Sequence, residues 1–112
     1  MNTREDDAFR SVKVDDLSWR RSTLASGVFV KDIAVTDGWE MQIVRCEPGA
    51  RFPRHTHGGP EFLFVLEGEL VQNGRMLGPG WASVAAAGSV DDDVHSDSGC
   101  VFVLVDRVEL SA

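Results

Sequence analysis

Short apolar runs separated by turn residues dominate the pattern along this chain. The runs at 27–35 and 39–46 are rich in branched and apolar residues, and the second alternates so that Met41 and Ile43 fall on one face, together with Arg45. An Asp-Gly pair at 37–38 lies between the two runs, and this dipeptide is typical of a tight β-hairpin. A Pro-Gly turn follows within 47–50.

The second half of the chain repeats this alternation of strands and turns. The segment 61–70 predicts the strongest strand of the chain, and the Asn-Gly pair at 73–74 predicts a hairpin turn. A further turn is predicted at 78–80, and a short strand at 81–85. The run 100–110 is apolar throughout and predicts a strand buried on both faces. No segment keeps apolar residues at helical spacing over several turns. The pattern therefore predicts an all-β sandwich or barrel with little or no helix.

Length and composition indicate how the chain is divided into domains. The chain has 112 residues, 43% of them hydrophobic, which favours one compact domain. We assign residues 1–10, which are polar, to a flexible N-terminal segment and 11–112 to a single domain. No apolar run approaches the roughly 18 residues that span a bilayer, and the first residues lack the apolar core of a secretion signal. We expect a cytoplasmic protein without membrane contacts.

The charge distribution narrows the choice of partners. The formal net charge is -7, and acidic residues cluster near the start and at 91–93, while no basic patch is present. Nucleic acid is therefore not an expected partner. The two cysteines, Cys46 and Cys100, both adjoin strand-like runs and are expected to be buried free thiols.

Two of the three histidines lie one residue apart, in the segment "PRHTHGGPEF" at 53–62. His55, His57 and Glu61 have the same parity, so all three side chains can point inward if a strand resumes after the glycines. Two imidazoles and one carboxylate are typical ligands of first-row metals: with open positions they suit non-haem Fe(II), and imidazole also suits Zn, Ni and Cu. The alternative is a surface turn whose histidines bind nothing.

The full spacing resembles the first motif of the cupin family. The residues that carry it are Gly49, His55, His57, Glu61 and Gly68, and Gly80 with Ala86, Ala87 and Gly88 resembles a degraded second motif. Within the cupins the chain is most similar to the cupin domain of the ChrR anti-sigma factors and its free-standing relatives. The further residues that carry this likeness are Trp19, Pro53, the Val65-Leu66-Glu67-Gly68 turn, Gly88-Ser89 and Gly99-Cys100. The resemblance spans roughly residues 12–106 and implies a small, jelly-roll-like cupin β-barrel around one metal ion.

The resemblance implies a further histidine from the second motif, and here the sequence departs from it. The position expected for that histidine holds Asp91, and the only remaining histidine is His95, which has the same parity as Asp91. Three alternatives stay open: Asp91 is a ligand, His95 is a ligand, or the site is weakened or lost.

Three or four protein ligands would leave positions on the metal open for water, O₂ or a substrate, and this favours a metal-dependent enzyme acting on a small organic molecule. One divalent transition metal per chain is expected, Fe(II) or Zn first, with Ni or Mn as alternatives. Fe(II) would favour oxygenase chemistry, and Zn or Ni isomerisation, cyclisation or hydrolysis, with Glu61 as the catalytic base. The competing interpretations are a ChrR-like sensor or accessory module without catalysis, and a scaffold that has lost its metal. By resemblance we also expect a homodimer.

Overall fold

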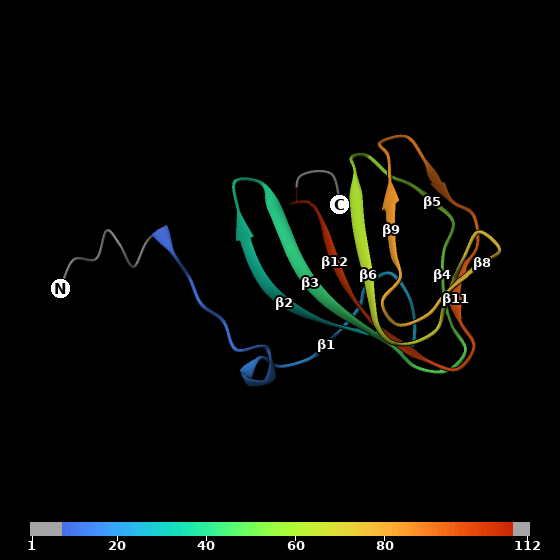
Figure 1. Ribbon diagram of the computed structural model, residues 1–112, viewed down its shortest axis with the longest axis horizontal. Coiled ribbons are helices and arrows are strands. Elements are labelled where there is room, and N and C mark those ends of the chain that lie inside the picture. The colour runs from blue at the N-terminus through green and yellow to red at the C-terminus, as the bar shows by residue number, and fades with distance from the viewer. Residues whose placement is uncertain (1–7, 109–112) are drawn as a thin grey trace.

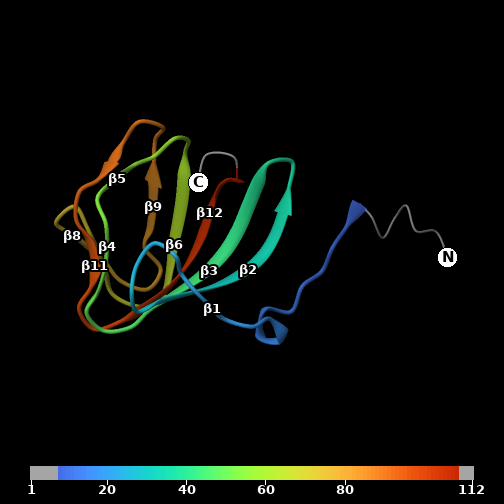
Figure 2. The same ribbon diagram turned by 180° about the vertical axis from the view of Figure 1, so that it is seen from behind.

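The structure, a computed structural model, describes residues 8–108, and apart from a 3-10 turn at Val14–Asp16 (η1) its named elements are strands. The larger sheet has the order β1 (Arg20–Arg21), β2 (Val28–Thr36), β3 (Trp39–Cys46), β12 (Cys100–Arg107), β6 (Glu61–Gly68), β9 (Ala82–Ala85). The second sheet has the order β4 (Ala50–Phe52), β11 (Val94–Ser96), β7 (Leu70–Gln72), β8 (Arg75–Leu77). A short ladder joins β5 (His55–Thr56) to β10 (Val90–Asp91). Figures 1 and 2 show the two larger sheets from opposite sides, with β5 close to the upper end of β9.

The hydrophobic core lies between the six-stranded and the four-stranded sheet. The core residues alternate along each strand, because successive side chains of a strand point to opposite faces. Val44 and Cys46 face inward from β3, Leu63 and Val65 from β6, and Phe102 from β12. The second sheet contributes the buried side chains Ala50, Leu70, Leu77 and Val94. Apolar surface is thus removed from water on one face of each sheet.

Both predicted hairpins are confirmed. Asp37 and Gly38 join β2 to β3 with φ of 53° and 80°, and Asn73 and Gly74 join β7 to β8 with φ of 49° and 82°. Two successive residues with positive φ form the turn whose twist matches that of the flanking strands, and Asn, Asp and Gly tolerate this conformation best.

Gly68, at the end of β6, allows a close approach of two backbones. Its φ is 72°, and a Cβ built on it would lie 2.1 Å from the carbonyl oxygen of Gly99. Any other residue would collide with the start of β12, and this contact explains why a glycine stands at this position.

The all-β prediction is confirmed, while one detail was wrong. Strand β12 is central in its sheet, between β3 and β6, but the side chains on its outer face are only half-buried. No second layer of the described chain packs on that face. Cys46 and Cys100 are buried and free, opposite one another in the β3–β12 ladder.

The ends of the chain lie outside the described range. Residues 1–7 of the segment predicted to be flexible, and 109–112 of the predicted domain, are not among the described residues. Within residues 8–108, no helix is long and apolar enough to cross a membrane.

Candidate metal centre

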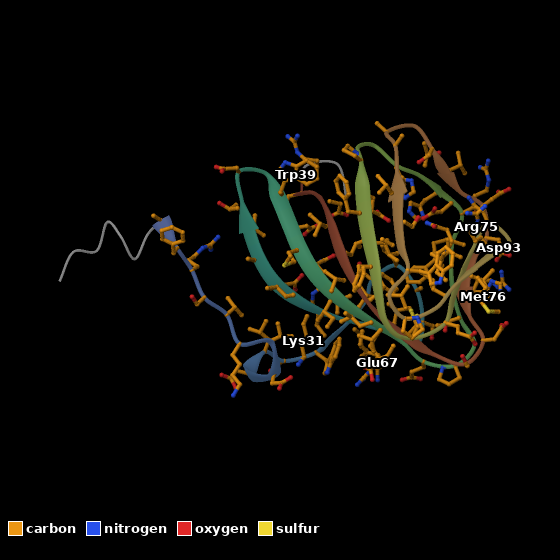
Figure 3. All side chains as sticks on the ribbon, viewed as in Figure 1. Lys31, Trp39, Glu67, Arg75, Met76 and Asp93 are labelled. Carbon is orange, nitrogen blue, oxygen red and sulfur yellow. The ribbon has the colours of Figure 1, made fainter. Side chains whose placement is uncertain are left out.

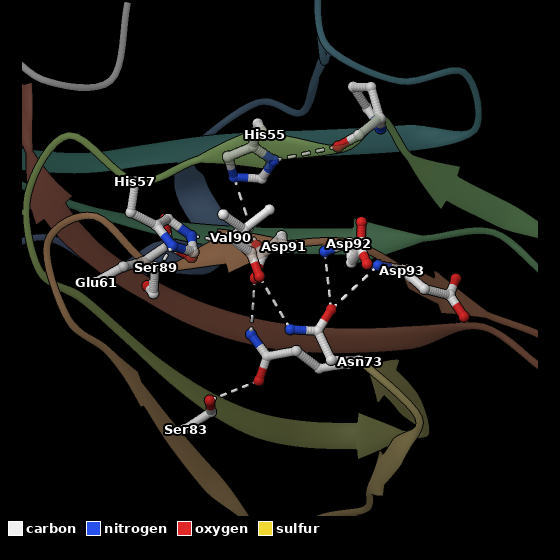
Figure 4. Close-up of polar contacts among 12 residues, drawn as sticks. His55, His57, Glu61, Asn73, Ser83, Ser89, Val90, Asp91, Asp92 and Asp93 are labelled. Carbon is white, nitrogen blue, oxygen red and sulfur yellow. Dashed lines mark hydrogen bonds and ion pairs between the residues drawn. The ribbon is translucent and has the colours of Figure 1, made fainter.

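The β5–β10 ladder brings together the two halves of the candidate site. Asp91 of β10 pairs with His55 of β5, and His57 follows two residues later, held by a hydrogen bond from its backbone N–H to the carbonyl of Ser89. The chain then bends through 58–60 and enters β6 at Glu61. Figure 4 shows His55, His57, Glu61 and Asp91 side by side.

One carboxylate oxygen lies at the centre of this group. Oδ2 of Asp91 is 3.1 Å from Nε2 of His57 and 3.4 Å from Nε2 of His55. One ligand atom from each of these three residues lies within 4.8 Å of the other two. The side chains of His57 and Asp91 are 4% and 8% exposed, whereas that of His55 is 41% exposed and borders the solvent.

The hydrogen bonds of the two imidazoles assign their tautomers. Nδ1 of His55 lies 3.2 Å from the carbonyl oxygen of Pro53, which only accepts hydrogen bonds, so Nδ1 carries the proton. Nδ1 of His57 lies 3.0 Å from Oγ of Ser89. The Ser89 hydroxyl donates its own proton to the carbonyl of Ala86 at 2.6 Å, so its oxygen accepts from His57. In their neutral forms both histidines therefore turn an Nε2 lone pair toward Asp91.

This arrangement favours a positive charge at its centre. Nε2 of His57 is fully buried and has no hydrogen-bond partner among the described residues. Two nitrogen lone pairs and a carboxylate oxygen repel one another at these distances unless a cation or a proton lies between them. Two imidazole nitrogens and one carboxylate oxygen form a donor set suited to divalent first-row metals. The residues present therefore fit a metal ion.

The Asp91 carboxylate is oriented by a chain of polar side chains. Gln72 Nε2 donates to Oδ1 of Asp91 at 3.4 Å, and the Ser83 hydroxyl donates to Oε1 of Gln72 at 2.6 Å. Asn73 holds the chain on both sides of Asp91: its amide nitrogen donates to the carbonyl of Val90, and its oxygen accepts from the backbone N–H of Asp92 at 2.8 Å (Figure 4). Such outer contacts fix ligand orientation and metal affinity.

Glu61 lies beside the three residues but is not one of them. Its Oε1 is 3.5 Å from Nε2 of His57, and its side chain is 16% exposed. Burial raises the pKa of the Glu61 carboxyl, and the negative charge of Asp91 adds to this effect, while His57 and His55 oppose it. Glu61 is thus placed to exchange a proton with a molecule bound next to His57.

His95 lies away from this group. In β11 the flanking residues Val94 and Ser96 are buried in the core, so the side chain of His95 points to the opposite face. Its Nδ1 is 2.9 Å from Asp93 Oδ1 and its Nε2 is 3.5 Å from Asp97 Oδ1. Of the two residues left open by the sequence, the structure brings Asp91 to the site.

A cavity of about 400 Å³ opens beside the candidate metal centre. His55, His57, Glu61 and Asp91 line one part of it. The large sheet contributes apolar side chains to its wall, and also the polar side chains of Glu40, Gln42 and Asp106. The volume suits a small organic molecule.

The site includes residues that the sequence analysis did not identify. These residues are polar but lie at inward positions of their strands. Gln72 has the same parity as Leu70 in β7, and the others have the parity of the core residues of β3 and β12: Glu40, Gln42 and Asp106. Polar residues at inward positions of a strand are the signal that could have found them, because burial of such groups is costly without a partner.

Comparisons with known proteins agree with this architecture. In Rhodobacter sphaeroides SigE in complex with the anti-sigma factor ChrR, the matching chain has a TM-score of 0.71 at 22% identity, over 85% of this chain and 51% of that chain. The polyketide cyclase RemF from Streptomyces resistomycificus has a TM-score of 0.78 at 20% identity, over 93% of this chain and 82% of that chain. A protein from Methylibium petroleiphilum, proposed to be an acetylacetone dioxygenase, has a TM-score of 0.81 at 19% identity, over 88% and 76% of the two chains.

These identities establish the fold alone. A search of curated protein sequences gave no match. The family model of the ChrR cupin-like domain, in contrast, matches residues 7–109, almost the whole chain. This protein therefore belongs to the ChrR cupin-like domain family and has the all-β cupin fold.

Proposed function

We propose that this protein is a mononuclear metal-dependent enzyme that acts on a small organic molecule. The observation that carries the proposal is the buried, unpartnered Nε2 of His57, which faces the Asp91 carboxylate at 3.1 Å on the wall of a cavity. A cation satisfies both groups at once, and the cavity leaves room for a substrate beside it.

Each site residue has a distinct role in this proposal. His55, His57 and Asp91 hold one divalent ion, Fe(II) or Zn foremost and Ni or Mn as alternatives. Such an ion supplies Lewis acidity toward a bound carbonyl, and Fe(II) in addition supplies chemistry with O₂. Glu61 Oε1 accepts a proton from the bound molecule, and Ser89 keeps the His57 proton on Nδ1.

Two structural neighbours support an enzyme of this kind. One is named a polyketide cyclase and the other is proposed to be an acetylacetone dioxygenase. Both names refer to compounds that carry ketone groups. A small oxygen-bearing molecule is accordingly our proposed substrate class.

Metal analysis of gently purified protein tests the proposal. We expect about one metal ion per chain in the wild type, as for a single site, and loss of the metal in His57→Ala and in Asp91→Ala. His95→Ala is the matched control, since it also removes an imidazole but lies outside the site, and it should retain the metal. A wild type that takes up neither Fe(II), Zn, Ni nor Mn, or a His95→Ala variant that loses the metal as the other two do, contradicts the proposal.

A sensor or accessory function is the second candidate, because the chain belongs to the family of the ChrR cupin-like domain. The two candidates differ in what happens to a bound molecule. An enzyme converts a carbonyl compound into product, and the Glu61→Gln variant should do so more slowly than the wild type. A sensor binds the compound and releases it unchanged.

We also propose that the protein forms a homodimer through the outer face of the large sheet. Five large apolar side chains on this face are at least 40% exposed: Met41, Phe62, Phe64, Leu66 and Val84. They come from β3, β6 and β9, with the half-buried outer residues of β12 between them. Together they expose on the order of 500 Å² of apolar surface, a large part of the roughly 800 Å² that each partner buries in a stable dimer.

A second copy of this chain is the partner we assign, because an apolar face can be complementary to itself across a two-fold axis. Phe64→Glu should convert a dimer to a monomer in analytical ultracentrifugation. Met76→Glu is the control, because Met76 is 57% exposed but lies on β8 of the other sheet. Figure 3 shows it well away from Glu67, which marks the large sheet. A monomeric wild type, or equal dissociation in both variants, contradicts this assembly.

A further inference from the structure

The wall of the cavity changes from polar to apolar one residue pair away from Glu61. Leu63 follows Glu61 by two positions in β6, so its side chain points to the same face, about 7 Å further along the strand. Leu104 of β12 is paired with Leu63, and both line the cavity. Asp106, two positions after Leu104, and its partner Glu40 lie on the polar side of this step. Apolar surface of the large sheet therefore begins directly beyond Glu61.

The opposite wall of the cavity is apolar at the same place. Phe52 of β4 is paired with Val94 of β11 in the four-stranded sheet, and both line the cavity. Gln72 is paired with Val94 from the other side and donates to Asp91, so this wall adjoins the candidate metal centre. The part of the cavity between these two walls is hereafter the apolar chamber, lined by Phe52, Leu63, Val94 and Leu104.

The polar side chains next to the apolar chamber are bonded to an exposed carboxylate at its edge. Gln42, the neighbour of Leu104 in the β3–β12 ladder, donates from Nε2 to Oδ1 of the exposed Asp32 at 2.9 Å. Arg20 donates to both oxygens of the same carboxylate, at 2.6 and 2.9 Å. These hydrogen bonds draw the polar groups toward Asp32 and leave hydrocarbon as the wall of the chamber.

Leu24 adds an apolar side chain where the cavity meets the solvent. It lies in the loop between β1 and β2, lines the cavity and is nevertheless 63% exposed. Backbone hydrogen bonds of 2.8 Å hold both ends of the loop, from Ser22 N–H to the Val28 carbonyl and from Glu47 N–H to the Gly27 carbonyl. Figure 2 shows the loop on the near side of the molecule, where β1 leads into β2. A molecule in the cavity would cover apolar surface that now faces water, which is favourable.

Resting on the proposed metal centre, we propose that the substrate joins an oxygen-bearing head to an uncharged apolar group a few carbon atoms long, which binds in the apolar chamber. The head lies beside His57 and Glu61. The apolar group contacts Leu63 and Leu104, and Leu24 covers its outer side. These three leucines are then specificity-determining residues. A charged group in the chamber would lose its water without gaining a partner, so charged tails are disfavoured.

Calorimetric titration with a series of hydroxamic acids tests this inference on protein loaded with zinc, or with whichever of the four proposed ions it takes up. The hydroxamate chelates the metal and keeps the head constant, while the tail is lengthened stepwise from acetyl to octanoyl. We expect the affinity to rise about three- to fourfold with each added methylene until the chamber is full, since burial of a methylene contributes roughly that much. A tail of the best length that ends in a carboxylate should bind at least about tenfold more weakly than its methyl-ended counterpart.

Variants locate the tail within the cavity. Leu24→Ser should weaken the binding of the best alkyl hydroxamate about fivefold and leave acetohydroxamate within about twofold, because only the longer tail reaches this side chain. Met76→Ser is the matched control, since Met76 is 57% exposed but lies on β8, outside the cavity, and it should keep the full dependence on tail length. Leu104→Phe narrows the chamber but keeps it apolar, and should shift the best tail to a shorter length.

Failure of this inference is distinguishable from failure of the proposed metal site. If acetohydroxamate binds and longer tails add nothing, or if Met76→Ser weakens the longer tails as much as Leu24→Ser, the inference is wrong and the metal site stands. Metal-loaded protein that binds no hydroxamate also overturns the inference. If the protein takes up none of the four ions, the proposed function itself is overturned, and this inference with it.

Discussion

Replacing Asp106 by Asn should stabilise the metal-free protein, and more strongly at alkaline than at acidic pH. Asp106 faces two other carboxyls on the inner side of the sheet, Glu40 and Glu61, and burial with these neighbours raises its pKa from 3.8 to about 8. Asparagine keeps the size of the side chain, cannot ionise, and offers an N–H donor to Glu40, which is hydrogen-bonded to Asp106 in the wild type.

The magnitude follows from the difference in proton binding between the folded and unfolded states. The native state holds the Asp106 proton more tightly than the unfolded chain, so this residue lowers the free energy of unfolding as the pH rises from about 4 to about 8. At about 1.4 kcal/mol per pKa unit, the upper limit of this loss is about 6 kcal/mol. Partial solvent access and the sharing of charge among three carboxyls reduce it to about 2 kcal/mol.

Urea denaturation in the presence of EDTA measures this effect. The Asp106→Asn variant and the wild type should have nearly equal free energies of unfolding at pH 4, and the variant should be about 2 kcal/mol more stable at pH 8. Glu67→Gln, which removes an exposed carboxylate, should show no such pH-dependent gain. An Asp106→Asn variant less stable than the wild type at pH 8, or a gain independent of pH, would refute the reasoning.

Three further predictions concern the surroundings of the site and the fold. Gln72→Leu removes the donor to the site carboxylate and should weaken zinc affinity about 10- to 100-fold in a competition titration, with unchanged far-UV circular dichroism; unchanged affinity would exclude an orienting role. The hydrogen bond from Arg20 lowers the pKa of Asp32 to about 2. The Asp32→Asn variant should therefore lose about 1 kcal/mol of unfolding free energy at pH 6, after allowance for the exposure of Asp32, and this difference should vanish between pH 4 and pH 2. A difference that stays constant with pH would contradict this prediction. Gly68→Ala should destabilise by more than about 3 kcal/mol in urea denaturation, because its Cβ collides with backbone at a positive φ, and a loss below 1 kcal/mol would contradict the close contact.

Local sequence determined the strands and their turns. The runs at 27–35 and 39–46 became β2 and β3, because alternating or continuous apolar residues fit a pleated surface that is buried on at least one face. The run 61–70, predicted as one strand, became β6, which ends at Gly68, and Leu70 begins β7 in the other sheet. Asp37-Gly38 and Asn73-Gly74 encode their hairpins through positive φ, a preference that needs no distant partner. The His55 and His57 pair was equally visible, since the two side chains are neighbours in the sequence.

The choice between Asp91 and His95 could not be made from the sequence. Parity places both on one face only if a single strand runs through them. The chain instead bends at 92–93 and resumes in another sheet. Asn73 holds this bend, and Arg54 and Arg51 donate to the carboxylates of its two aspartates. Strand parity is a property of one continuous strand and is lost across such a bend. The core position of Val94 then fixes His95 on the outer face.

The cavity, likewise, exists only in the tertiary structure. Glu40, Glu61 and Asp106 are separated by tens of residues along the chain, and their meeting depends on the registers of β3, β12 and β6. Those registers are set by the packing of Phe102, Leu63 and their neighbours across two sheets. The sequence alone thus determined which segments form strands and which histidines begin the candidate metal site, because those signals are local. Non-local strand pairing decided which carboxyl lies beside those histidines and which carboxyls line the cavity, because only pairing brings distant side chains to one wall.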